Sequence, residues 1–326
     1  YLFAYSDLKG RWDKTWMIER QGITQGIDNN QTFIRTHIHM LRRQWKYALD
    51  EVRSFRIQGV YRLDRITPLS TDAFNLTKPT QFAGQAGALI AYVFDNIRER
   101  MINIPEGMRY RVWAEYYVNP IASESTFGTT GFDLRIYKPV WRNVIWANRL
   151  AADWSIGELR LLHMIGGVDN TLSLISNAES PIDPNINYAY QSRLAPLRGF
   201  NTNARNGSHM ALFNSELRIP IWSTLSSHPI DTELLQTLQF VGFFDVGSAW
   251  NGKHPYDNTN TFNQVTVTQN PITVTIDNNR EPIIWGTGFG LRGKVLGYWL
   301  RADWSWGVDD GRWQERIFNL SLQLDF

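Results

Sequence analysis

Phe318-Asn319-Leu320-Ser321-Leu322-Gln323-Leu324-Asp325-Phe326 is the stretch of sequence that decides the fold. Apolar and polar residues alternate along it without a break, so every second side chain falls on the same face of an extended strand. In an amphipathic helix the apolar residues would recur at alternating spacings of three and four, whereas here they recur at every second position. It therefore predicts a β-strand whose apolar face consists of Phe318, Leu320, Leu322, Leu324 and Phe326.

The same alternation recurs through most of the chain. It predicts further strands at residues 33–40, 55–63, 86–95, 110–116, 132–136, 146–154, 211–219, 240–250, 289–294 and 300–306. The first thirty residues are harder to interpret, with strand pieces at 1–5 and 15–18, and Pro105-Glu106-Gly107 predicts a tight turn. We expect an all-β chain of about eleven to thirteen strands without a helix of any length.

One long segment, residues 157–208, breaks this pattern. Its periodicity is weak, although the strands predicted on both sides are the most regular in the chain. A loop of this length without secondary structure is uncommon inside a compact domain and is usually functional. Leu197-Arg198-Gly199-Phe200 lies near its end. We expect the strands to form a wall around this loop.

Composition excludes several classes of protein. At 326 residues the chain could be two ordinary domains or one large β-barrel. A net charge of +2 provides no basic field for nucleic acid, and the absence of cysteine removes disulfides, thiolate metal sites and cysteine nucleophiles. The longest apolar run, Ala86–Phe94, is about half of the ~20 residues that a spanning helix needs. Because Tyr1 is not an initiator and no signal peptide is visible, we expect a mature or truncated chain.

The strands could form a soluble sandwich or a membrane barrel. A sandwich turns its polar faces to water, whereas a membrane barrel turns its apolar faces to lipid and its polar faces to a wet lumen. Here the polar faces carry charges of both signs, and aromatic residues recur at predicted strand ends, as in aromatic girdles. The residues in question are Trp146, Trp154, Trp250, Tyr298, Trp304 and Trp306. Together with the apolar final strand ending on Phe326, these features favour a transmembrane antiparallel β-barrel with strands of about nine to eleven residues.

Four motifs in order resemble those of one family. They are Leu197-Arg198-Gly199-Phe200, the strand from Phe240 to Trp250 with its Asp-x-Gly-x-x-Trp ending, Gly286-Thr287-Gly288-Phe289-Gly290-Leu291-Arg292, and the run from Phe94-Asp95-Asn96 to Pro105-Glu106-Gly107. In order and spacing, residues 33–326 resemble the barrel domain of BamA-type outer-membrane proteins, the bacterial surface antigen family, which is related to two-partner secretion transporters.

The resemblance implies a 16-stranded barrel with the loop 157–208 folded into its lumen. It also implies that Arg198 contacts an inward acid on each of the two strands after the loop, which by position are Glu216 and Asp245. Both acids fall on the polar faces derived above, and a buried guanidinium requires carboxylates placed for its planar fork. Gly199 would allow a close backbone approach and Phe200 would pack at the loop tip. The alternative is that Arg198 is an ordinary solvated loop residue.

The chain departs from the family pattern in two respects. Fewer strands are predicted than sixteen, and the periplasmic polypeptide-transport-associated domains do not occur in this sequence. An open barrel would leave unpaired edges in lipid. Either an N-terminal portion is missing or this member has a reduced barrel, and the cost of open edges favours the first. We therefore expect residues 1–326 to be a single barrel domain that lacks an N-terminal portion.

The sequence contains few motifs typical of an enzyme or a metal site. We expect no enzymatic activity, because no nucleophile elbow and no phosphate-binding loop before a helix can be found. His37 and His39 could bind a metal, but a polar pair facing the lumen is the simpler interpretation. Asp303, Asp309 and Asp310 are expected to be lumen and loop acids. No cofactor and no metal is expected.

Three functions remain open for such a barrel in the bacterial outer membrane. The first is an assembly or translocation factor that opens laterally between its first and last strands to insert outer-membrane proteins or pass polypeptides. The second is a membrane anchor or scaffold in a multi-subunit complex or for a separate effector domain, and the third is a passive channel, which the lumen loop disfavours. Expected partners are outer-membrane lipid, lipopolysaccharide, outer-membrane or periplasmic proteins and unfolded clients, and no nucleic acid.

Overall fold

The structure is a computed structural model that describes the chain except for 13 short segments. These are residues 27–32, 70–78, 120–125, 173–179, 181, 184–185, 193, 226–231, 259, 261–262, 270–271, 278–279 and 323–326. Strands dominate the described residues, which confirms the all-β prediction. The expectation of no helix was wrong in detail, because the connection between two strands contains the five-residue helices α2 (Ile221–Leu225) and α3 (Glu233–Thr237). Within the described part of the chain, no helix is long and apolar enough to cross a membrane.

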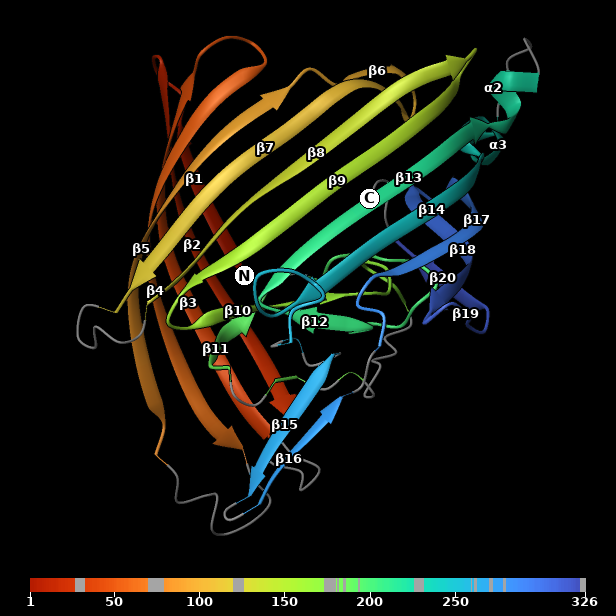
Figure 1. The fold of residues 1–326 in the computed structure, drawn as a ribbon. Coiled ribbons are helices and arrows are strands. Elements are labelled where there is room, and N and C mark those ends of the chain that lie inside the picture. Colours follow the sequence, from red (N-terminus) through yellow and green to blue (C-terminus); the bar gives the residue numbers. More distant parts are fainter. Residues whose placement is uncertain are drawn as a thin grey trace. The chain divides into compact units, whose positions relative to one another are not determined.

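The strands follow the chain in the order that Figure 1 shows. They are β1 (Leu2–Asp7), β2 (Trp12–Gly26), β3 (Phe33–Ala48), β4 (Arg53–Leu69), β5 (Gln81–Asp95), β6 (Arg98–Met101), β7 (Ile104–Val118), β8 (Phe127–Trp141), β9 (Val144–Gly157), β10 (Arg160–Ile165), β11 (Tyr188–Gln191), β12 (Arg205–Gly207), β13 (His209–Pro220), β14 (Gln239–Trp250), β15 (Gln264–Gln269), β16 (Ile272–Asp277), β17 (Ile284–Val295), β18 (Tyr298–Asp309), β19 (Arg312–Trp313) and β20 (Ile317–Ser321).

Hydrogen bonding arranges the described strands into three sheets. The largest has 15 strands in the order β1-β2-β3-β4-β5-β7-β8-β9-β13-β14-β17-β18-β19, with β20 beside β18 and β6 beside β7. The pairs from β1 to β4 and from β9 to β18 are antiparallel. A three-stranded sheet has the order β11-β10-β12, and β15 and β16 form a hairpin.

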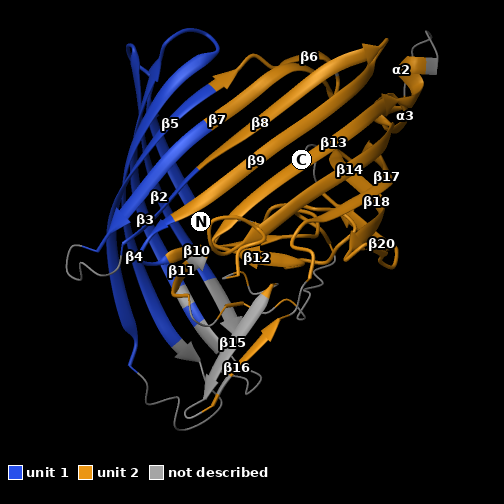
Figure 2. Cartoon of the chain, in the orientation of Figure 1, with its two compact units in different colours: residues 1–93, 112–130, 156–159 blue, residues 94–111, 131–155, 160–326 orange. Residues whose placement is uncertain are grey.

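The chain divides into two compact units (Figure 2). Unit 1 consists of residues 1–93, 112–130 and 156–159, and it contains the strands β1 to β4. Unit 2 consists of residues 94–111, 131–155 and 160–326. The candidate site lies entirely within unit 2.

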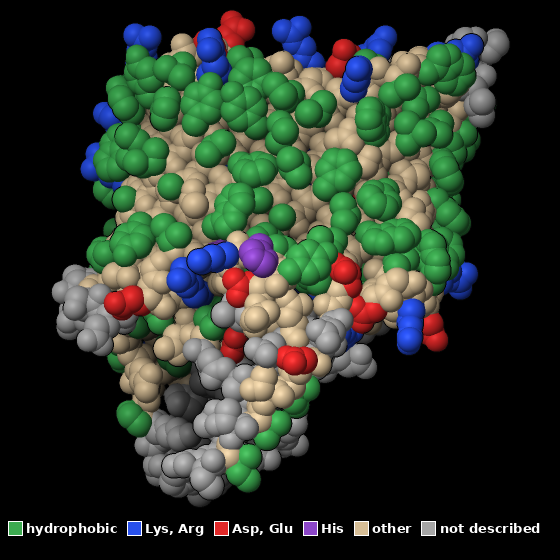
Figure 3. Space-filling model, viewed as in Figure 1, with side chains coloured by type: hydrophobic (Ala, Val, Ile, Leu, Met, Phe, Trp, Pro, Cys, Tyr) green, Lys and Arg blue, Asp and Glu red, His purple; other side chains and the backbone are tan. Residues whose placement is uncertain are grey.

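In unit 2 the polarity of the sheet is the reverse of that in a soluble protein. On β13, Glu216 and Arg218 are 1% and 2% exposed, whereas Leu217 between them is 41% exposed. Figure 3 shows hydrophobic side chains spread over the outward strand face, with charged side chains gathered beyond the strand ends. A soluble protein buries apolar side chains and leaves Glu and Arg in water. We call the buried, charge-bearing face of these strands the inward face.

Three predictions of local structure were wrong. Pro105-Glu106-Gly107 lies within β7, and the turn is at Ile102-Asn103, where Asn103 adopts a positive φ of 58°. Trp250 is buried against the ring of His209 and does not belong to an outward girdle. The long strands reach 12 to 17 residues, more than the predicted length, because they continue beyond the apolar stretches that marked them.

Segment 157–208 has secondary structure of its own. β10 pairs with β11 in parallel and with β12 antiparallel, so three short strands lie where weak periodicity predicted an irregular loop. Each strand has only three to six residues, which is too short for a period to be recognised in the sequence.

The final strand is described as far as Leu322. Phe318 and Leu322 are exposed, while Asn319 and Ser321 are buried on the inward face, as the alternation predicts. Leu324 and Phe326 lie outside the described residues.

Candidate functional site

Arg198 lies on the inward face of unit 2, between two strands. Its Nε and Nη2 donate to the two carboxylate oxygens of Asp245 on β14 at 2.5 and 2.6 Å, and its Nη1 donates to Glu216 Oε1 on β13 at 2.6 Å. The backbone N–H of Arg198 also donates to Asp245 Oδ2 at 3.1 Å. We call these three side chains the latch. The structure thus brings together the residues that the sequence motif paired.

The latch belongs to a larger charge network that sequence reasoning did not identify. Glu216 also accepts hydrogen bonds from Arg218 at 2.8 Å and from Arg292 at 2.6 Å, and Arg301 lies 3.9 Å away. Arg301 in turn contacts Asp303. The alternation of side chains along each strand could have placed Arg218, Arg292 and Arg301 on an inward face. Only the register of β13, β14, β17 and β18 brings them around the carboxylate of Glu216.

The network is buried. Arg198, Glu216 and Asp245 are at most 2% exposed. Burial alone would lower the pKa of Arg198, but the carboxylates of Asp245 and Glu216 outweigh burial and raise that pKa above its ordinary value. Arg198 therefore stays charged, and each carboxylate must keep its cations nearby, since an uncompensated buried charge is costly. The guanidinium also lies over the ring of Phe243, 3.7 Å from its centroid.

Glycines allow the loop backbone to approach the strands closely. Gly199 has φ +92°, and a Cβ there would lie 2.6 Å from the backbone of Trp306 and Gly307. A Cβ on Gly307 would lie 2.4 Å from the Gly199 carbonyl oxygen, and a Cβ on Gly286 only 1.9 Å from that of Arg198. Side chains at these positions would separate the loop from β17 and β18. The glycine of the loop and the glycines of the two strands are therefore all part of the site.

Apolar packing flanks the latch. Leu197 and Phe200 are buried in one hydrophobic cluster with residues of the neighbouring strands, including Leu212 on β13, Ala249 on β14 and Ile284 on β17. Phe200 thus packs against the neighbouring strands. The latch and this cluster together fix the end of the loop to the neighbouring strands of the inward face.

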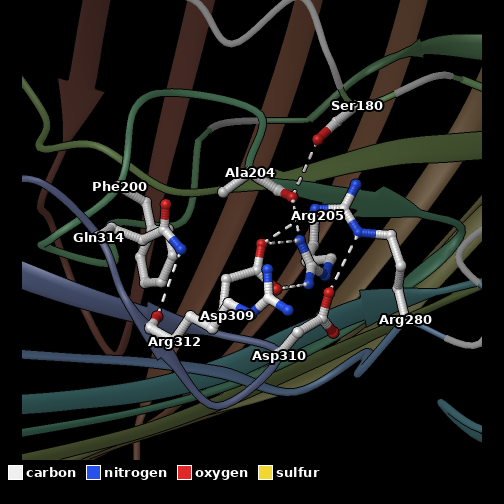
Figure 4. Close-up of a pocket in the computed structure, with 9 residues that line it drawn as sticks. All are labelled: Ser180, Phe200, Ala204, Arg205, Arg280, Asp309, Asp310, Arg312 and Gln314. Carbon is white, nitrogen blue, oxygen red and sulfur yellow. Dashed lines mark hydrogen bonds and ion pairs between the residues drawn. The ribbon is translucent and has the colours of Figure 1, made fainter.

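A second set of ion pairs holds the loop beside Phe200. Arg205, only 1% exposed, donates to both carboxylate oxygens of Asp309 at 2.5 and 3.2 Å and to the carbonyl oxygen of Glu281 at 2.8 Å. Arg280 bridges Asp309 and Asp310 at 3.2 and 3.5 Å. The side chains of Arg205, Arg280, Asp309 and Asp310 line a polar pocket (Figure 4), whose volume is about 420 Å³. Asp309 and Asp310, expected to be loop acids, therefore lie at the end of β18, where Asp309 binds the loop.

His163 on β10 is a buried titratable group in the same loop. Its Nδ1 lies 2.9 Å from Ser192 Oγ, and its Nε2 lies 4.0 Å from Asp153, beyond hydrogen-bond distance. Burial, with a smaller contribution from His209, lowers the pKa of His163 to about 4. At neutral pH the imidazole is therefore uncharged.

This burial predicts a loop that weakens in mild acid. Between pH 6.5 and 4 the unfolded loop binds a proton at His163 that the folded loop excludes, so stability is lost as the pH falls through this window. The ordinary pKa of histidine is 6.5, so pH 5 lies 1.5 units below it. At pH 5 the loop therefore loses about 2 kcal/mol of stability. Limited proteolysis of the loop at pH 5 and at pH 7.5 measures this loss of stability.

The control for this prediction is His163→Asn. Asparagine can keep a hydrogen bond to Ser192 but does not titrate, so this variant should lose less loop protection between pH 7.5 and pH 5 than the parent does. An equal pH dependence in the variant and the parent would mean that another group is responsible.

Of the remaining candidate residues, the two histidines of β3 do not join the site, whereas Asp303 does. His37 and His39 lie on β3 in unit 1, and in the described part of the chain no three His, Asp or Glu side chains are grouped as a metal site. Asp303 is fully buried on the inward face of β18 and belongs to the charge network.

Comparison with known proteins identifies the fold. No protein-family model and no curated protein sequence matches the chain. Among solved structures, the chain resembles BamA from Haemophilus ducreyi lacking POTRA domains 1–3, with a TM-score of 0.61 and 11% identity, over 98% of this chain and 60% of that one. It also resembles CdiB from Escherichia coli (TM-score 0.53, 12% identity, 98% and 51% covered) and from Acinetobacter baumannii (0.52, 12%, 99% and 49%). The chain thus spans between about half and three fifths of their lengths.

Proposed function

We propose that this chain, which has the fold of the BamA and CdiB barrels, is an outer-membrane β-barrel that inserts outer-membrane proteins or passes polypeptides across the bacterial outer membrane. The observation that carries the proposal is the reversed polarity of unit 2 in a sheet of this fold. Its exposed face is apolar, as lipid requires, and its charged inward face holds a loop fixed by Arg198. Outer-membrane lipid and lipopolysaccharide would surround the apolar face.

The proposed mechanism is lateral opening between β1 and β20. A strand edge presents unpaired N–H and C=O groups that a client strand can bind by adding to the sheet. β20 has features of a weak partner, because its inward face carries Asn319 and Ser321, which add little apolar packing. The latch would hold the loop in place while this edge opens.

The alternative is a membrane anchor or scaffold for other outer-membrane or periplasmic proteins. The observation that favours it is the density of buried ion pairs and glycine contacts, which holds the loop against the inward face. The same feature disfavours a passive channel for small solutes. We expect no catalytic activity in either case.

Depletion of the protein in cells separates the two functions. If the protein is an assembly factor, depletion should lower the total amount of folded outer-membrane proteins, because their insertion would stop. A scaffold would leave that amount unchanged and would remove only its own complex. The measurement is quantitative mass spectrometry of outer membranes after depletion, with re-expression of the parent chain as the control.

Crosslinking tests the mechanism separately. The chain has no native cysteine, so single cysteines can be placed along Leu2–Asp7 and Ile317–Ser321 without background. A disulfide between these strands should abolish rescue of the depleted cells, and a reductant should restore it. Locked protein that still rescues would rule out lateral opening.

A further inference from the structure

In unit 1 the strands β2, β3 and β4 have one exposed face that is largely apolar. Their register places its side chains in rows across the three strands, and the row of Ile18, Leu41 and Tyr61 is exposed throughout. Arg43, which lies within these apolar rows, covers the ring of Trp16 at 4.5 Å from its centroid. We call this face the outer face of unit 1. Its apolar rows have the character of the lipid-facing band of a membrane barrel.

Basic side chains follow the apolar rows at one end of the outer face. In the next row Arg20 is opposite His39, and in the row after that His37 is opposite Arg65. Opposite residues of an antiparallel pair have Cβ atoms about 4.5–5.5 Å apart, and long side chains also reach the diagonal neighbours. The four side chains therefore form one cluster, which we call the basic patch.

No acid of these three strands shares the outer face with the basic patch. Their acids are Asp13, Glu19 and Asp64, and by alternation all three lie on the opposite face. Each of them forms an ion pair there with a base of the same three strands. The charges of that face are thus balanced within the sheet, whereas Arg20 and Arg65 are exposed and can bind an external anion.

Gly22 leaves room within the basic patch. It is opposite His37 and contributes no side chain to that row. A Cβ there would lie 3.4 Å from Nδ1 of His37, and within the described residues no atom outside this imidazole comes within 4 Å of it. A phosphate group could enter beside Gly22, because its oxygens accept hydrogen bonds from a guanidinium fork and from an imidazole N–H.

The basic patch lies at the end of the strands that has the longer connections. In unit 1, residues 27–32 and 70–80 connect the strands at this end, whereas residues 8–11 and 49–52 connect them at the other. In outer-membrane barrels the longer connections are extracellular and the short turns are periplasmic. A cationic cluster directly beyond an apolar band on this side lies where the hydrocarbon of the outer leaflet meets its headgroups.

We propose that the basic patch is a binding site for the phosphate groups of an outer-leaflet glycolipid of the lipopolysaccharide class. Arg20 and Arg65 bind the phosphate oxygens, His37 and His39 donate further hydrogen bonds, and the acyl chains pack on the apolar rows beside the patch. The proposal rests on the proposed function only in placing the chain in the outer membrane.

Native mass spectrometry of the purified full chain in detergent measures this binding, because each bound lipid adds its own mass. The probe is lipid A with its phosphates, and the parent chain should bind it. Arg20→Gln with Arg65→Gln should bind it about 25-fold more weakly, since a basic residue beside an anionic lipid surface contributes about fivefold to binding. Gly22→Glu should also weaken binding, because it places a carboxylate beside His37.

Matched variants separate the basic patch from a general effect of charge. Arg11→Gln with Arg53→Gln removes the same number of exposed charges at the opposite end of the strands, so it should bind as the parent does. Arg65→Lys keeps the charge without the planar fork and should bind with intermediate affinity. All variants should keep the heat resistance of the parent on semi-native gels, because the changed residues are exposed.

Matched ligands identify the group that is recognised. Lipid A without its phosphates should bind to the parent no better than lipid A binds to the double Arg20 and Arg65 variant. Phosphatidylglycerol should bind more weakly than lipid A, and inorganic phosphate at millimolar concentration should not displace the lipid. Equal binding of phosphatidylglycerol, or displacement by inorganic phosphate, would overturn the assignment to a phosphorylated glycolipid.

Two further results would overturn the site itself. One is equal binding of lipid A with and without phosphates, and the other is an equal loss of binding in the Arg11 and Arg53 variant. The depletion experiment is independent of both. Cells whose outer-membrane proteins are unchanged by depletion would refute the assembly function while leaving lipid binding at the basic patch intact.

Discussion

Arg198→Ala is expected to lower the free energy of unfolding by about 3–5 kcal/mol, the usual cost of removing one partner from a buried ion pair. All hydrogen bonds that the structure gives to the Asp245 carboxylate among the described residues come from Arg198, so the variant buries an uncompensated charge. The folded form should therefore convert to the unfolded form at a lower temperature on semi-native gels. The loop should also become sensitive to protease.

A second substitution tests whether the uncompensated charge of Asp245 causes the loss of stability. Adding Asp245→Asn to Arg198→Ala removes the orphaned charge and should restore part of the heat resistance. Adding Glu216→Gln should not, because Glu216 still balances Arg218 and Arg292. Equal recovery by both double variants would contradict the assignment of Asp245 as the acid that depends on Arg198.

An exposed arginine provides the matched control. Arg53 pairs with Asp50 at 2.5 Å, but its side chain is 53% exposed. An ion pair in water contributes little to stability, so Arg53→Ala should leave the gel transition nearly unchanged. If Arg53→Ala lowered the transition temperature as much as Arg198→Ala does, the gel would be reporting a general effect of removing a charge.

Gly286→Ala is expected to release the loop without removing any polar group. The new Cβ would lie 1.9 Å from the carbonyl oxygen of Arg198, so the loop backbone has to move away from β17. Overpacking of this kind costs about 1–3 kcal/mol, and movement of the loop would also disturb the latch. Limited proteolysis should then cut within residues 158–208 at protease concentrations that leave the parent intact.

Gly242→Ala is the control for this prediction. Gly242 lies on β14, and a Cβ there would meet nothing within 4 Å. This variant should keep the protease resistance of the parent. Equal cleavage in both variants would show that any glycine substitution in these strands weakens them, and that close approach at Gly286 is not the cause.

Much of this arrangement could be predicted from the sequence, because side chains on a strand alternate strictly between two faces. That rule identified the all-β fold and the inward position of Glu216 and Asp245. The motif at Leu197–Phe200 then paired Arg198 with both acids, and the structure places all three in contact.

Only the tertiary structure decided which inward residues meet and where the loop lies. Arg292 is 76 residues from Glu216 in sequence and reaches it through strand register, which depends on contacts that no local pattern records. The close approach of the loop backbone at Gly286 depends likewise on the path of the loop. Local alternation determines the face on which a side chain lies, whereas non-local packing determines its neighbours.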